Sequence, residues 1–404
     1  MDEPARLAQR HRRYYRDKVV AAQTNWFSPS EQDLLDWARA AWDNIVTAIE
    51  TSLTSGEPAL GLEISAGLIS LRAPFFKGML REMRRWTERT LQATRTLTPQ
   101  PTELQIRAMT LIGWLAVIQG RREDAERMLE DCAAACIGDP KTRQHWRQTP
   151  DTDIGLPAPV EFLWGATLMF VQCDLRAITV LARASEKYRA LDDRGGEARS
   201  EWHEALAASF LGSAQQALQI SRRHLDHATA SGDGWPKSFA EMAWAIALTK
   251  HGDPTEALDF GSTALARQLR IRDEWGAAWA VQIRMWSLAQ IITDLIAAGN
   301  PDRARLRELA TETAQLAGGA TTLRAGPVVY LVNLGLYADE TNKAIDVARS
   351  VLGHKAFTAA ERQGCLLRPE LHEVQRLALG TLSIDRLPMD HPARKLGIES
   401  VRDW

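Results

Sequence analysis

The chain has 404 residues, of which 25% are charged and 45% are hydrophobic, and its formal net charge is −2. This charge gives no electrostatic reason to expect nucleic-acid binding, and no apolar run reaches the roughly 20 residues of a membrane-spanning helix. Four cysteines in this length predict a reducing cytoplasm. Glycine and proline fall mostly at turn positions and no strand-type alternation persists, so the sequence predicts an all-α fold.

The first hundred residues predict helices without a regular repeat. A basic, arginine-rich helix is expected over residues 3–23, followed by helices over 31–54, 59–72 and 79–94. The basic helix can face an acidic partner, or it can be an ordinary solvated helix. We interpret residues 1–100 as an N-terminal helical cap of irregular hairpins.

A helical hairpin is clearest at residues 241–266. An apolar helical period stops at Gly252-Asp253-Pro254 and then restarts. Glycine can end a helix in the left-handed conformation, aspartate can cap the next helix, and proline suits its first position. Ala245 and Ala257 fall where the two antiparallel helices would press together.

The same frame recurs along residues 101–355. The alanine early in the second helix is followed every 40 to 52 residues by another, at Ala125, Ala177, Ala217, Ala257, Ala304 and Ala344. Five residues before these alanines, glycine stands in four of six cases; twelve residues before, a small residue stands in four of six. Three features in one frame predict an array of helical hairpins, with turns near Gly120, Gly252 and, in the last repeat, Asp339.

Two segments fall outside this frame. Residues 137–159 form a long insertion, which is expected to be either a functional lid or a disordered loop. Residues 356–404 are expected to form C-terminal capping helices, over about 356–380, and a tail.

The repeat pattern resembles tetratricopeptide repeats, with a longer spacing than the usual ~34 residues. The whole chain is also similar to the C-terminal region of actinobacterial LuxR-type and related STAND-class ATP-binding transcriptional regulators. The similarity lies in four segments, which follow one another in the same order as in those regulators. They are RHRRYY at 10–15, WDNIVTAIE at 42–50, LREMRRWTERTL at 80–91 and GWLAVIQGRREDAERML at 113–129.

This resemblance implies a right-handed α-solenoid that acts as the sensor region of a cytoplasmic regulator. In such regulators a nucleotide-binding module precedes this region and a DNA-reading helix-turn-helix follows it. We therefore expect the chain to be a fragment or a relative without its catalytic front, and to bind no DNA by itself.

Catalytic and metal motifs are not found in the sequence. It contains no phosphate-binding GxxxxGK[ST] loop and no GxGxxG, GxSxG or HExxH. Cys132 and Cys136 stand four apart on one predicted helix, but zinc would need two further ligands. We expect no enzyme activity, no cofactor and no metal site.

The candidate binding residues follow from the resemblance. Tetratricopeptide arrays form their concave wall from fixed positions of each first helix, and here those positions are rich in aromatic side chains. The candidate residues are Arg107, Trp114, Phe162, Met169, Phe170, Arg199, Trp202, Phe210, Phe239, Met242 and Trp286. The same wall includes Thr249, Lys250 and Ala289, and Arg107, Arg199 and Lys250 can orient an acidic group.

An apolar wall of this extent must bind something or be covered. Three alternatives remain open: the wall packs on itself, it forms a pocket for a hydrophobic or aromatic small-molecule effector, or it holds a partner protein. The first function hypothesis is therefore an effector sensor. The second is a scaffold or oligomerisation module that binds a partner helix or a second copy, with no small-molecule ligand.

Overall fold

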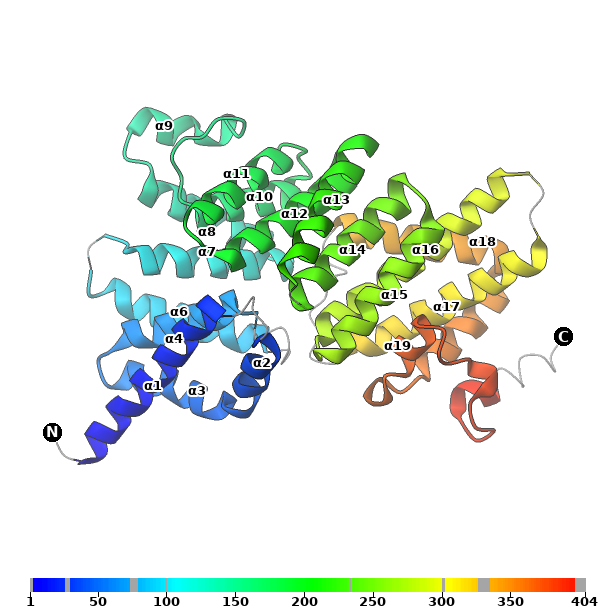
Figure 1. Cartoon of the computed structure of the whole chain (residues 1–404), viewed down its shortest axis with the longest axis horizontal. Helices are drawn as coiled ribbons and strands as arrows, with labels where there is room; N and C mark the ends of the chain where they lie inside the picture. The colour runs from blue at the N-terminus through cyan, green and yellow to red at the C-terminus, as the bar shows by residue number, and fades with distance from the viewer. Residues whose placement is uncertain are drawn as a thin grey trace. The chain divides into compact units, whose positions relative to one another are not determined.

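All regular structure in the described part of the chain is helical, and no strand occurs there (Figure 1). The computed structural model describes residues 3–25, 30–72, 79–98, 100–232, 234–299, 302–325 and 335–396. The chain forms two compact units, Met1–Leu211 with Ala228–Pro236, and Gly212–His227 with Lys237–Trp404. The boundary between these units lies near residues 211–237. The predicted boundaries between segments instead lie near residues 100 and 355.

The helices of the first unit are α1 (Glu3–Asn25), α2 (Glu31–Ala40), α3 (Trp42–Thr54), α4 (Pro58–Ser70), α6 (Leu80–Arg95), α7 (Glu103–Ile118), α8 (Arg122–Cys136), α9 (Pro140–His145), η1 (Trp146–Gln148), α10 (Ala158–Thr167), the π-helical η2 (Leu168–Gln172), α11 (Ala177–Ala190) and α12 (Arg194–Leu211). Two helices contribute residues to both units, α13 (Ala214–Ser231) and α14 (Gly234–His251). The second unit continues with α15 (Pro254–Arg270), α16 (Glu274–Ala297), α17 (Arg303–Ala325), α18 (Gly335–Cys365), η4 (Pro369–Leu371), α19 (Glu373–Ala378) and η5 (Ile384–Arg386).

Successive helices pack against their neighbours in sequence within each unit. In the first unit α7 packs on α8, α10 on α11 and α11 on α12; in the second, α15 packs on α16, α16 on α17 and α17 on α18 (Figure 1). A chain in which each hairpin is covered by the next is an α-solenoid. The structure thus confirms the predicted all-α solenoid of helical hairpins.

The regular array starts at a strong capping signal. Thr102 accepts a hydrogen bond from the Gln105 backbone N–H (3.3 Å), and the Gln105 side chain accepts one from the Thr102 backbone N–H (2.9 Å). This capping box satisfies two N–H groups that the first helical turn leaves without intrahelical partners. It explains why α7 begins at Glu103.

The turn between α14 and α15 is partly as predicted. Asp253 caps α15 by accepting from the Thr255 N–H at 2.7 Å, and Pro254 occupies the first helical position. The prediction of a left-handed Gly252 is wrong, since left-handed φ values occur instead at other turn glycines such as Gly120 (69°) and Gly299 (84°). A Cβ at position 252 would lie 3.0 Å from the Leu248 side chain, so close packing accounts for this glycine.

Two predicted boundaries are also wrong. The expected turn at Asp339 lies inside α18, which continues through that position. Residues 326–334 of the arm expected before this turn lie outside the described residues. α18 is instead broken at Gly353, which has φ 75°. The single helix expected over 31–54 is two helices, which end and begin on either side of Ala41.

The insertion at 137–159 is fastened to the first unit at several points. Trp146 is buried, and its ring centroid lies 5.0 Å from that of Trp164. Lys187 donates to Asp153 (2.7 Å) and to the Leu156 carbonyl (2.8 Å), while Arg183 donates to the Pro150 carbonyl. This segment is therefore an ordered part of the first unit, and the disordered alternative does not describe it.

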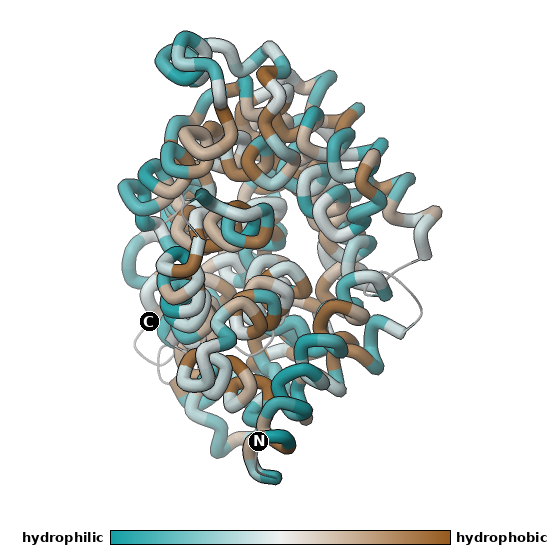
Figure 2. Tube along the Cα trace, turned by 90° about the vertical axis from the view of Figure 1, so that its left-hand side faces the viewer, coloured by the Kyte–Doolittle hydropathy of each residue, from teal (hydrophilic) through white to brown (hydrophobic). Residues whose placement is uncertain are grey.

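The helices differ in how much of their surface they bury. Along α8, α11 and α15 hydrophobic and hydrophilic residues alternate, as a period of 3.6 residues requires when one side faces a neighbour, whereas α7 and α16 are buried at most positions (Figure 2). In the described part of the chain, no helix is long and apolar enough to cross a membrane.

Among the described glycines, the closest approach to another helix's backbone lies between α17 and α18. A Cβ added at Gly318 would lie 1.9 Å from the Glu361 carbonyl oxygen, and one at Gly364 would lie 1.9 Å from the Gln315 carbonyl oxygen. Backbone atoms cannot move aside as a flexible side chain can. The two helices therefore approach this closely only because both positions are glycine.

Replacing Gly318 by alanine is expected to lower the free energy of unfolding by about 3 kcal/mol, because the two helices must separate. Thermal and urea unfolding measure this effect. Gly261 is the matched control: it also lies within a helix, but a Cβ there meets nothing within 4 Å. Gly261→Ala should raise stability by about 0.5–1 kcal/mol through helix propensity. Equal effects of the two substitutions would contradict this account.

Candidate functional site

The candidate residues are mostly covered by the chain itself. Nine of the eleven are buried, with Trp114, Met169 and Met242 at 0% exposure, while Arg107 and Phe210 are half-buried. An open apolar wall therefore does not occur at these positions, as the self-packing alternative predicts. The question becomes what the buried side chains surround.

In the first unit several of them converge on two guanidinium groups. We call this the arginine–aromatic cluster; its members are Arg72, Trp114, Phe162, Arg199, Trp202, His203 and Trp235. The Arg72 Cζ lies 4.3 Å from the Trp235 ring centroid, 5.4 Å from that of Trp202 and 5.9 Å from that of Trp114. The Arg72 side chain is buried, and three ring faces lie within cation–π distance of its guanidinium group.

Arg199 reaches the same cluster from α12. Its Cζ lies 5.6 Å from the Trp114 centroid and 5.1 Å from that of Phe162, so both arginines share the Trp114 ring. Arg199 is 5% exposed, it makes no ion pair with a described residue, and its Nε has no hydrogen-bond partner there. Burying a charged group without an opposite charge costs several kcal/mol, of which a desolvated cation–π contact recovers about 2.

The pKa of His203 is lowered by its position in this cluster. Its ring centroid lies 4.6 Å from that of Trp202 and 5.0 Å from that of Phe162. The Nδ1 atom is 2.8 Å from the Arg199 carbonyl, which can only accept, so Nδ1 carries the proton of a neutral imidazole. Burial first, and then the charges of Arg72 and Arg199, lower the pKa of His203 to about 3.

Three members of the cluster were missed by the sequence analysis. Trp235 is positioned by its backbone N–H, which donates to the Glu31 carboxylate at 3.0 Å, and Arg72 lies just after α4. Both are distant in sequence from α7 and α12, so no local spacing connects them. His203 directly follows the candidate Trp202, but position 203 is not one of the wall positions of the repeat, so the repeat frame did not select it.

The other candidate residues of the first unit make contacts outside the cluster or at its edge. Arg107 donates to Gln23 and to Ser70 (3.1 Å), which ties α7 to α1 and α4. Phe170 reaches the cluster edge, with its ring centroid 5.9 Å from that of His203. Met169 and Phe170 lie on the π-helical turn η2, and Met169 is fully buried.

In the second unit the candidates join a continuous series of aromatic rings. Phe239 stacks on Trp275 (6.0 Å), Trp275 contacts Trp279 (5.4 Å), and Trp279 contacts Tyr337 (4.4 Å), which stacks on Trp286 (5.9 Å). Met242 receives a contact from the Gln268 amide. Trp286 also lines a pocket together with Thr249, Lys250 and Ala289, all of which are predicted wall positions.

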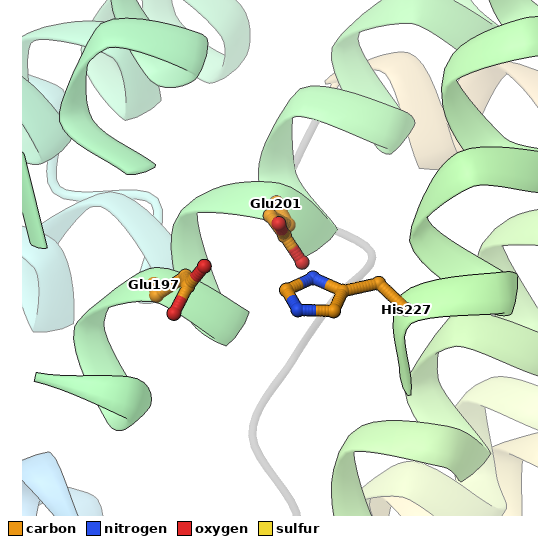
Figure 3. Close-up of side chains that lie close together, drawn as sticks. All are labelled: Glu197, Glu201 and His227. Carbon is orange, nitrogen blue, oxygen red and sulfur yellow. The ribbon is translucent and has the colours of Figure 1, made fainter. Parts of the chain in front are cut away.

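Two acidic side chains on α12 are explained by an ion pair. Glu197 and Glu201 lie one turn apart and point to the same side of the helix (Figure 3). Arg189 donates to Glu197 at 2.6 Å and to Glu201 at 3.1 Å. This basic partner within the first unit accounts for their arrangement.

The spaced cysteines show no sign of reactivity. Cys132 is buried, Cys136 is half-buried, and burial raises the pKa of both thiols above its ordinary value. Neither forms a disulfide. A raised pKa keeps the thiol protonated, which opposes nucleophilic attack.

Comparison with known proteins identifies no family. No family model matches the sequence, and no curated protein matches it at a significant level. Among solved structures the chain is similar to a circular tandem repeat protein with novel repeat topology and enhanced subunit contact surfaces, with 15% identity over 98% of this chain and 95% of that one. The TM-score of 0.21 is too low for this similarity to support any conclusion about function.

The pKa of His203 predicts a loss of stability in acid. Because the folded pKa is about 3 and the ordinary value 6.5, the unfolded state takes up the proton first. The stabilisation is present above about pH 6.5 and is lost as the pH falls, by about 2 kcal/mol between pH 7 and pH 5. Urea unfolding at both pH values measures it.

His203→Gln should show about 2 kcal/mol less of this pH dependence than the unmodified chain. The exposed His354 offers a matched control, since His354→Gln should retain the full dependence. The explanation fails if His203→Gln responds to acid as strongly as the unmodified chain does.

Proposed function

We propose that the chain is a non-catalytic effector-binding module of a cytoplasmic transcriptional regulator, and that its effector is a flat, hydrophobic organic anion. The regulatory role rests on the sequence resemblance to LuxR-type and STAND-class regulators. The observation that supports the ligand class is the buried Arg199, which has ring faces beside it and no acidic partner in the described part of the chain.

An anion would complete this cluster chemically. A carboxylate accepts charge-assisted hydrogen bonds from a guanidinium, and a buried charge gains most from such a partner. Trp114 and Phe162 offer large apolar surfaces for a flat hydrocarbon group. Both features favour an aromatic or hydrophobic acid over a neutral sugar or a free phosphate.

The same cluster is unsuited to acid–base catalysis. Arginine does not release its proton in proteins, and a histidine with a pKa of about 3 does not take one up near neutral pH. General acid–base catalysis needs a group whose pKa lies near the working pH. These properties support a binding role for the cluster.

Burial of the cluster provides a means of signalling. Its side chains are almost fully covered, so a ligand enters only when neighbouring helices rearrange. An effector that binds the rearranged state more tightly shifts the equilibrium toward that state. In the complete regulator this shift would be passed to the other modules that the resemblance implies.

The alternative function is a scaffold that holds a partner helix or a second copy. Such a module needs an apolar groove open to solvent. The predicted wall residues do not form one, since nine of the eleven are buried. We therefore prefer the effector-binding function.

The direct test is titration of the purified chain with 2-naphthoate and with its neutral analogue 2-naphthylmethanol by calorimetry. Arg199→Met is expected to weaken naphthoate binding about tenfold to a hundredfold and to leave the alcohol unchanged, because one charge-assisted contact is lost. Replacing a buried arginine that has no acidic partner in the described part of the chain by an apolar residue of similar length should also raise stability by about 1–2 kcal/mol.

Arg362→Gln is the control, because Arg362 is an exposed arginine on α18. Mass spectrometry of a denaturing extract would reveal an effector carried through purification. If naphthoate binds equally to the unmodified chain and to Arg199→Met, or if nothing binds and the extract is empty, the scaffold function becomes the better explanation.

A further inference from the structure

A second, smaller site lies entirely within the second unit. It is a cavity of about 130 Å³ between the end of α14, the middle of α16 and the second turn of α18. A cavity of about 150 Å³ holds one benzene molecule. The lining residues are Thr249, Lys250, His251, Trp286, Ala289, Gln290, Glu340, Lys343 and Ala344.

One wall of this pocket is a tryptophan held in a fixed orientation. The Trp286 Nε1–H donates to the Thr341 hydroxyl at 3.1 Å, and the indole stacks on Tyr337 with an interplanar angle of 9°. Trp286 is 4% exposed, so it contributes a flat apolar surface without the cost of ordering a mobile side chain. Such a wall suits a planar ligand.

The polar side of the pocket carries an excess of positive charge. Lys250 is paired with Glu340, so these two charges cancel. Lys343 is exposed and makes no ion pair with a described residue. Two lysines and one glutamate leave one positive charge at the rim, beside the aromatic wall.

Two further polar groups of the lining already have protein partners. The Thr249 hydroxyl lies 2.7 Å from that of Ser287, and it donates to the Ala245 carbonyl. The Gln290 amide donates to Asp294 at 2.8 Å. Lys343, which is exposed, is therefore a donor that a ligand can reach.

We propose that this pocket binds a compact planar carboxylate of about the size of benzoate. Its ring lies against Trp286, and its carboxylate accepts from Lys343. No residue is shared with the arginine–aromatic cluster, so this site stands independently of the effector proposal.

Calorimetric titration of the full chain with benzoate, benzamide and inorganic phosphate tests the proposal. Benzamide has the shape of benzoate without its charge, and phosphate has charge without a ring. Benzoate is expected to bind at least tenfold more tightly than either, and Lys343→Gln should weaken it about tenfold while leaving benzamide unchanged. Arg362→Gln, which removes an exposed positive charge farther along α18, should leave benzoate binding unchanged.

Two further variants separate this site from the first. Arg199→Met should retain benzoate binding in full, so a loss there would assign the signal to the arginine–aromatic cluster and overturn the proposal. Trp286→Leu should weaken benzoate and benzamide alike. The proposal is also overturned if benzoate and benzamide bind equally, if phosphate alone binds, if Lys343→Gln has no effect, or if millimolar benzoate gives no signal.

Discussion

The structure depends on one constraint: a helical hairpin has apolar side chains on more than one side and cannot bury them alone. Each hairpin must be covered by the next, so small residues are needed wherever two helices come close. Gly113 shows this in the first unit, where a Cβ would lie 2.7 Å from Leu163 of α10. The repeated spacing of small residues along the chain follows from these repeated helix contacts.

Large aromatic residues are buried in both units. In the first unit they surround two guanidinium groups, and in the second they form a series of stacked rings. The two interiors differ in charge although they come from the same repeat frame. Charge inside an apolar interior is costly, so the interior of the first unit carries a desolvation cost that a purely aromatic interior does not.

The hairpin frame was predictable because its signals are local. Asp253 and Pro254 cap and start α15 through contacts within a few residues, and Thr102 and Gln105 do the same for α7. The break at Ala41 carries no glycine or proline and was missed. The surroundings of Arg199 were not predictable, since Arg72 and Trp235 reach it from distant parts of the sequence, and the exposure of a wall residue depends on which neighbour covers it.

The ring series of the second unit has an optical consequence. Phe239, Trp275, Trp279, Tyr337 and Trp286 follow one another at centroid distances of 4.4 to 6.0 Å. Excitation absorbed by one indole can pass to the next over such separations before light is emitted. Emission from these rings is therefore a shared property, and a quencher that touches Trp286 alone would also dim tryptophans that it never reaches.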